Sequence, residues 1–176
     1  MMEIEYEFRE QDLVHFNETR LQKSEEIRQN LKKNRLLVPG VMVLIAAFYY
    51  FYYGDRNATA YILVLAGMWA WLSPKLILLD LQRQILSKYS AKEKASMFGI
   101  YTLTIDPATP QYLLEKSPSG KHKMQWADLL RVEYGKRHVY IYIDMGTALV
   151  IPIETVKKGN LMEFAKQAEK LIERLG

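Results

Sequence analysis

Hydrophobic residues gather in two long runs near the middle of the chain. Residues 36–53 form eighteen consecutive positions without a charge, and residues 59–74 form a second run that continues beyond Lys75. Only five residues, 54–58, separate the two runs. A helix rises about 1.5 Å per residue, so eighteen residues cover about 27 Å, close to the thickness of a bilayer's apolar core. The pattern predicts a transmembrane helical hairpin over residues 36–79, in which Pro74 either kinks or ends the second helix.

A different pattern occupies residues 99–176. Apolar and polar positions alternate there in short runs, which is typical of half-buried strands, and a helical period with Asn160 as the N-cap and Glu163 in a capping box follows. We predict six antiparallel strands closed by one amphipathic helix. The strand runs are residues 99–106, 111–116, 121–126, 129–134, 138–144 and 147–153, and the helix faces inward through Leu161, Phe164, Ala165, Ala168, Leu171, Ile172 and Leu175.

The first residues add another strand. Ile4, Tyr6 and Phe8 alternate with glutamates over residues 2–8, and an isolated strand is not stable in water. We therefore expect this strand to join the sheet of the C-terminal domain. The chain then divides into an N-terminal strand and basic helix (1–35), the hairpin (36–79), a connector helix (80–98) and a compact domain (99–176), which makes an α+β membrane protein.

Charge gives the expected orientation. The net charge is +4, and eleven lysines and arginines flank the two apolar runs, while the short loop between them has only Arg56 beside Asp55. The positive-inside rule then places both termini in the cytoplasm, as a multi-pass protein of the cell membrane. Because the basic residues follow the membrane flanks and form no stripe on a folded face, we do not expect a nucleic-acid partner. The flanking residues are Arg20, Lys23, Arg28, Lys32, Lys33, Arg35, Lys75, Arg83, Lys88, Lys92 and Lys94.

Several local motifs resemble the YcxB-like family of bacterial membrane proteins. They are EYEF at 5–8, DLVHFN at 12–17, YTLTID at 101–106, a tryptophan-centred strand end at 126–129 and the pair Ile151-Pro152. The resemblance covers most of the chain and implies a pleckstrin-homology-like (PH-like) C-terminal domain, with no biochemical activity to carry over. Family members usually have basic residues after the Ile-Pro pair, but this chain has Ile153, Glu154 and Thr155, so the resemblance implies no anion site at that corner.

No residue cluster in the sequence indicates a reaction. His15, His122 and His138 fall on different predicted elements, the chain has no cysteine, and no glycine-rich phosphate loop occurs. A zinc site needs three or four converging ligands. We therefore expect no metal, no cofactor and no enzymatic activity.

Three sets of residues are candidates for binding. Lys116, Lys121 and Lys123 flank the turn at 117–120, where they either meet lipid headgroups or protect an exposed hairpin from aggregation. Tyr140 and Tyr142 share one strand face, where they either line a groove for a partner or cover the outer surface of the sheet. Trp126 is either a core residue or a ligand-stacking aromatic.

The sequence hypothesis is a non-enzymatic membrane protein whose cytoplasmic PH-like domain binds a protein partner. One alternative is a sensor of anionic lipid headgroups that uses the three lysines. The other is an immunity-type protein that acts against a membrane-active toxin through its spans. The oligomeric state stays open.

Overall fold

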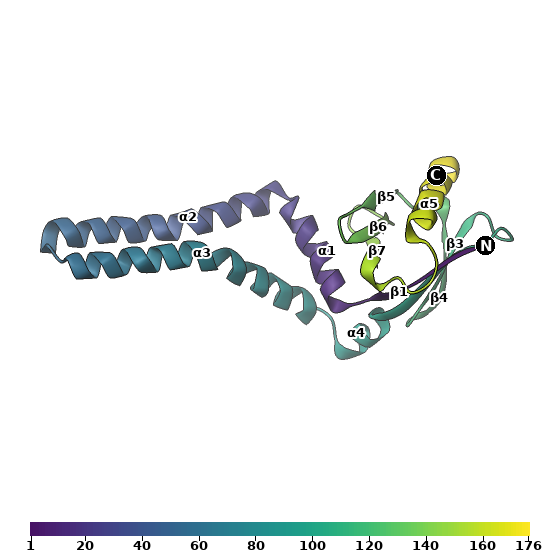
Figure 1. Cartoon of the computed structure of the whole chain (residues 1–176), viewed down its shortest axis with the longest axis horizontal. Coiled ribbons are helices and arrows are strands. Elements are labelled where there is room, and N and C mark those ends of the chain that lie inside the picture. Colours follow the sequence, from purple (N-terminus) through teal and green to yellow (C-terminus); the bar gives the residue numbers. More distant parts are fainter. The chain divides into compact units, whose positions relative to one another are not determined.

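The chain folds as two compact units in the computed structural model. One unit combines Met1–Phe16 with Tyr89–Gly176, and the other is Asn17–Lys88. The structure describes residues 1–176 apart from the side chain of Ile27. Figure 1 shows the elements of both units.

The second unit is a helical hairpin. Helix α2 (Glu25–Phe48) runs into a short π-helical turn (Tyr49–Tyr53), and helix α3 (Arg56–Ser87) returns. Gly54 takes a left-handed backbone (φ 66°) between them, and Asp55 caps α3 by accepting hydrogen bonds from the amides of Asn57 and Ala58. Helix α3 continues through Pro74, so the proline does not end it.

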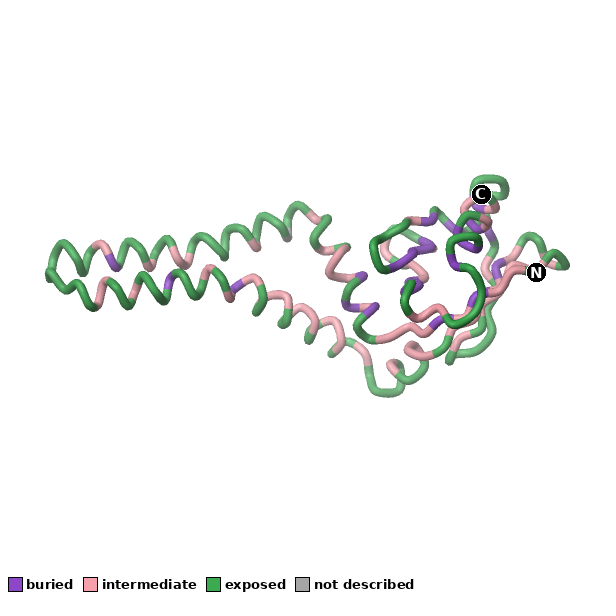
Figure 2. Tube along the Cα trace, viewed as in Figure 1, coloured by how far each residue is buried: buried purple, intermediate pink, exposed green. Residues whose placement is uncertain are grey.

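Both hairpin helices are long and apolar enough to cross a membrane, judged by length and composition. Small side chains lie at their contact, because Ala46 and Ala66 are only 1% and 4% exposed, and small residues let two helices approach closely. The Thr59 hydroxyl donates to the Asp55 carbonyl at 2.8 Å, and its oxygen lies 3.4 Å from the Ala46 carbonyl of the other helix. Most other apolar side chains of the hairpin face outward, as the exposed stretches in Figure 2 show.

The segments that flank the hairpin differ from the expectation. Residues 9–35 do not form a single helix, because α1 (Glu10–Gln22) stops before Ser24, which has an extended backbone and starts α2. Ser24 followed by Glu25 and Glu26 is a typical helix start, since acidic residues stabilise the first turn. The connector is also divided: α3 extends to Ser87, and a short helix α4 (Ala91–Met97) begins at a capping box of Ser90 and Glu93.

A four-stranded antiparallel sheet in the order β1-β2-β3-β4 dominates the first unit. Its members are β1 (Met2–Phe8), β2 (Gly99–Ile105), β3 (Tyr112–Ser117) and β4 (Gly120–Gln125). Every residue of β1 pairs with β2, from Met2 opposite Ile105 to Phe8 opposite Gly99. The prediction that strand 2–8 joins the sheet beyond the hairpin is therefore confirmed.

The remaining strands form a second antiparallel sheet, in the order β5-β6-β7. These are β5 (Arg131–Tyr134), β6 (His138–Tyr142) and β7 (Ala148–Pro152). Short 3-10 turns follow β4 (Trp126–Asp128) and β7 (Ile153–Thr155), and helix α5 (Leu161–Leu175) ends the chain. All six strands predicted after residue 99 are present and antiparallel, but they are divided between two sheets because β4 and β5 do not pair.

Side chains from both sheets and α5 form one core. Trp126 is fully buried there, with Ile4 and Tyr6 from β1 and Phe164, Ala165 and Ala168 from α5. The core interpretation of Trp126 is therefore confirmed.

Gly159 lets the chain before α5 pass close to β1. Its φ is 85°, and a Cβ atom there would collide with the Glu3 carbonyl. The neighbouring Lys158 forms a bridge with Glu5, so the edge of β1 is covered by the segment that leads into α5.

Candidate functional sites

The outer face of the four-stranded sheet brings the three predicted lysines together. Strand alternation turns Leu103 and Leu113 into the core, so their neighbours project from the opposite face. The register then aligns two rows across three strands: Thr102, Lys116 and Lys121 form one, and Thr104, Leu114 and Lys123 form the other.

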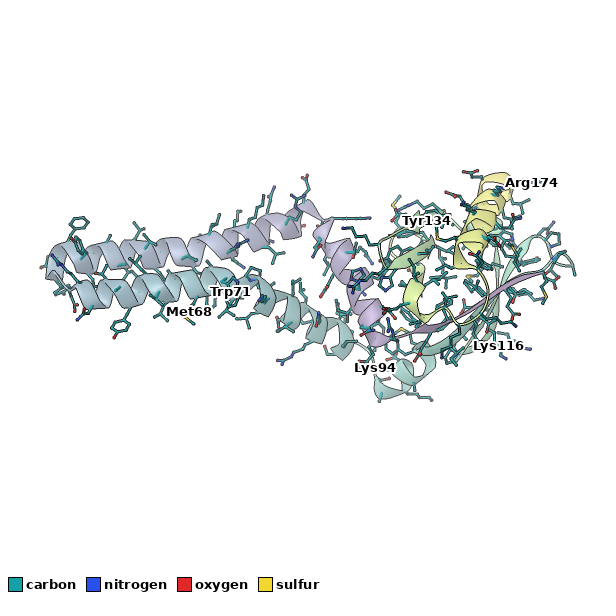
Figure 3. All side chains as sticks on the ribbon, in the orientation of Figure 1. Met68, Trp71, Lys94, Lys116, Tyr134 and Arg174 are labelled. Carbon is teal, nitrogen blue, oxygen red and sulfur yellow. The ribbon has the colours of Figure 1, made fainter. Side chains whose placement is uncertain are left out.

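These two rows line a hollow of about 290 Å³. Figure 3 labels Lys116 on this sheet. Glu115 and His122 complete the lining, but alternation directs their side chains to the other face. Glu115 is paired with the core residue Leu103, on the face that also has Tyr101. Burial first, and then the charge of Glu115, raise the pKa of Tyr101 to about 12.

The charges on this outer face are unevenly distributed. Lys116 lies directly opposite Lys121, and like charges in that position destabilise a sheet. Within the described residues, none of the three lysines forms an ion pair. The nearest strand with acidic residues on this face is β1, where Glu3 already pairs with Lys158 at 2.6 Å and Glu7 lies 3.8 Å from Lys157.

Tyr140 and Tyr142 have a different environment from the one expected of contact residues. They are 7% and 8% exposed, and the Phe16 ring from α1 lies over them at centroid distances of 5.5 and 6.1 Å. Val150 completes this small cluster. The two tyrosines do share one face, but α1 covers that face, so they neither line an open groove nor form the outer surface of the sheet.

Helix α1 is attached to β6 through a buried charged contact that the sequence did not reveal. Asp12 is 1% exposed, and its Oδ1 accepts a hydrogen bond from Nε2 of His138 at 2.8 Å. Its Oδ2 accepts from the backbone amide and Nε of Arg9, both at 3.0 Å. The His15 ring stacks on His138 with centroids 4.8 Å apart. Two of the three histidines therefore meet in space, although 126 positions separate Asp12 from His138.

The electrostatics of this contact favour the charged carboxylate. Burial raises the pKa of Asp12, but hydrogen bonds from Arg9 and His138 outweigh it and leave the pKa below its ordinary value of 3.8. Arg9 also reaches Glu154 at 2.6 Å, and this hydrogen bond lowers the pKa of Glu154. The Thr155 hydroxyl donates to the Glu7 carbonyl at 2.9 Å. The 3-10 turn after β7 therefore contacts both the end of β1 and the residue that precedes α1.

The buried contact of Asp12 with Arg9 and His138, called the clamp below, has the composition of a structural contact. Among the described residues, no three histidine, aspartate or glutamate side chains are grouped so that they could hold a metal ion. Asp12 receives hydrogen bonds from Arg9 and His138, which fixes the first turn of α1 against the start of β6. The lysine-lined hollow, in contrast, is open to solvent and has donors that are not paired with carboxylates.

No family model, no curated protein and no solved structure matches this chain.

We predict that Asp12→Asn lowers the free energy of unfolding by about 1–3 kcal/mol, because the amide cannot satisfy Arg9 and His138 as a carboxylate does. The pKa of Asp12 is lower in the folded chain than in the unfolded one, so its contribution is complete at neutral pH. It is lost as the pH falls below 3.8 and through the folded pKa. Thermal unfolding of the full chain in an uncharged detergent over a series of pH values measures both effects.

The exposed Asp128 provides a matched control. Asp128→Asn should unfold like the wild-type chain at every pH. If Asp12→Asn also matches the wild type at neutral pH, the clamp does not stabilise the fold.

Proposed function

We propose that this chain is an integral membrane protein of the cytoplasmic membrane in which α2 and α3 both span the bilayer and both termini are cytoplasmic. The length and outward apolar surface of the two helices support the spans. The excess of lysine and arginine on the outer flanks supports the orientation. Lys75, whose ammonium lies 4.3 Å from the centre of the Trp71 ring, suits an interfacial position.

We further propose that the first unit is a PH-like domain. Four strands in one antiparallel sheet, three in a second and a closing C-terminal helix are the arrangement that supports this assignment. The core follows the same arrangement, since α5 packs against residues of both sheets.

The function that we propose is non-enzymatic: the hairpin holds this domain at the membrane, where it binds a protein partner. The observation that carries the proposal is the full-length pairing of β1, which precedes the hairpin, with β2, which follows it. A hairpin inserted inside a domain attaches that domain to the membrane through two chain segments. Such an attachment suits an interaction domain that must stay at the membrane surface.

The proposed topology predicts the accessibility of single cysteines, which the native chain lacks. Asn57→Cys, near the hairpin turn, should react with a membrane-impermeant maleimide in intact cells. Ser119→Cys, in the exposed turn between β3 and β4, should react only after the membrane is permeabilised. The reverse labelling pattern, or release of the chain by alkaline carbonate, would contradict the proposal.

The partner proposal predicts that the full chain, purified from native membranes in a mild uncharged detergent, retains a second protein in constant ratio. The matched control is the hairpin alone, residues 17–88, which should not retain it. Retention by the hairpin alone would instead favour the immunity-type alternative, which acts through the spans. Recovery of anionic lipid without protein would favour the lipid-sensor alternative.

A further inference from the structure

We propose that the lysine-lined hollow on the outer face of β2, β3 and β4 is a binding site for a phosphate-bearing anion. The inference rests on the proposed function only in treating the domain as a binding unit. The hollow is defined by Thr102, Thr104, Leu114, Lys116, Lys121 and Lys123, with Glu115 and His122 at its lining. The pairing register fixes these residues as neighbours on one sheet face.

The hollow has an unfavourable arrangement of like charges. Lys116 and Lys121 are directly opposed across β3 and β4, and Lys123 lies two positions along from Lys121 on the same face. Cross-strand pairs of like charge destabilise a sheet, and no carboxylate among the described residues pairs with these ammonium groups. An anion bound between them removes the repulsion and gains three favourable contacts.

The hollow combines two kinds of hydrogen-bond donor. Two threonine hydroxyls stand beside the lysines in the same rows, and a phosphate group accepts hydrogen bonds from hydroxyls as well as from ammonium groups. The Leu114 side chain, between Thr104 and Lys123, supplies an apolar contact at the centre of the second row. The site therefore offers charge, directional donors and an apolar surface within a single hollow.

The size of the hollow limits the size of the ligand. A hollow of about 290 Å³ suits a compact ligand. A phosphate group concentrates its negative charge on adjacent oxygens, which three lysines around one hollow can share. An acidic protein segment distributes single carboxylates along an extended chain, so it matches this arrangement less well. The same phosphate chemistry is available from a phospholipid headgroup or from a soluble phosphate compound.

The test is lysine footprinting on the full chain in lipid nanodiscs, with pyrophosphate as the soluble probe. The rate of acylation at each lysine is measured by mass spectrometry. Discs of phosphatidylcholine alone, the same discs with pyrophosphate, and discs that contain phosphatidylglycerol are compared. We expect acylation of Lys116, Lys121 and Lys123 to be several-fold slower in the presence of pyrophosphate, in discs that contain phosphatidylglycerol, or under both conditions. The exposed Lys136 and Lys166 should keep their rates.

The arms of the experiment distinguish the two sources. Protection by pyrophosphate alone identifies a soluble phosphate ligand, and protection by phosphatidylglycerol alone identifies a headgroup. The proposal is overturned if neither slows the three lysines, if all exposed lysines are slowed equally, or if polyglutamate protects them and pyrophosphate does not. None of these results depends on the labelling pattern that tests the membrane topology.

Charge variants separate binding from folding. The double variant Lys116→Glu and Lys121→Glu should lower affinity for the protecting probe at least about tenfold, whereas the charge-matched pair Lys136→Glu and Lys166→Glu should leave it unchanged. Lys116→Glu alone places opposite charges across the strand pair, so it should raise the melting temperature slightly while it weakens binding. Unchanged affinity in the double variant would overturn the proposal.

Discussion

The pairing of β1 with β2 is the constraint on which the other features of this chain depend. Seven consecutive residue pairs join a strand that ends at Phe8 to one that begins at Gly99. Closing a flexible loop of about 90 residues costs about 4 kcal/mol before any constant term. The intervening hairpin reduces this cost because it is a compact unit of its own, and Gln82 near the end of α3 donates to Glu18 of α1 at 2.7 Å. The burial of Ile4 and Tyr6 in the core then holds β1 in place.

The same pairing determines what surrounds each candidate site. With β1 in the sheet, α1 follows directly and its first turn meets β6, where Asp12 binds His138 and Phe16 covers Tyr140 and Tyr142. The tyrosines become part of a small core instead of a contact surface. On the outer face of the sheet, Glu7 and Glu3 of β1 pair with Lys157 and Lys158, and Glu5 lies opposite Thr102 without an ion pair to the lysines of β3 and β4. The lysines of β3 and β4 are thereby left as the basic part of that face.

Much of this architecture could be predicted from local patterns. Alternation with period two identified all seven strands, and the helical period with Asn160 identified α5, because half-buried elements repeat their apolar residues at the spacing of their backbone. The partner of the 2–8 strand was also predictable, since that strand needs a sheet and the expected topology placed both chain ends on the same side of a membrane.

The remaining features depend on contacts between distant residues. Asp12 is an ordinary acidic residue in the first turn of a helix, and nothing near it in sequence indicates a histidine 126 positions away. The division into two sheets depends on the failure of β4 and β5 to pair, which the spacing of the strands does not determine. The lysines were identified from their places around a turn, but only the cross-strand register shows that Lys116 opposes Lys121 and that threonines stand beside them.

Hydrogen exchange reports on the β1–β2 pairing directly when it is measured on a chain in which a flexible glycine–serine linker replaces residues 17–88. If the first unit is one domain interrupted by the hairpin, this shortened chain folds, and the amides that join β1 and β2 exchange slowly. Residues 89–176 alone should then be much less protected throughout β2 and the core. Equal protection of β2 in both chains would show that β1 is dispensable, and would contradict the account of the hairpin as an insertion into a single domain.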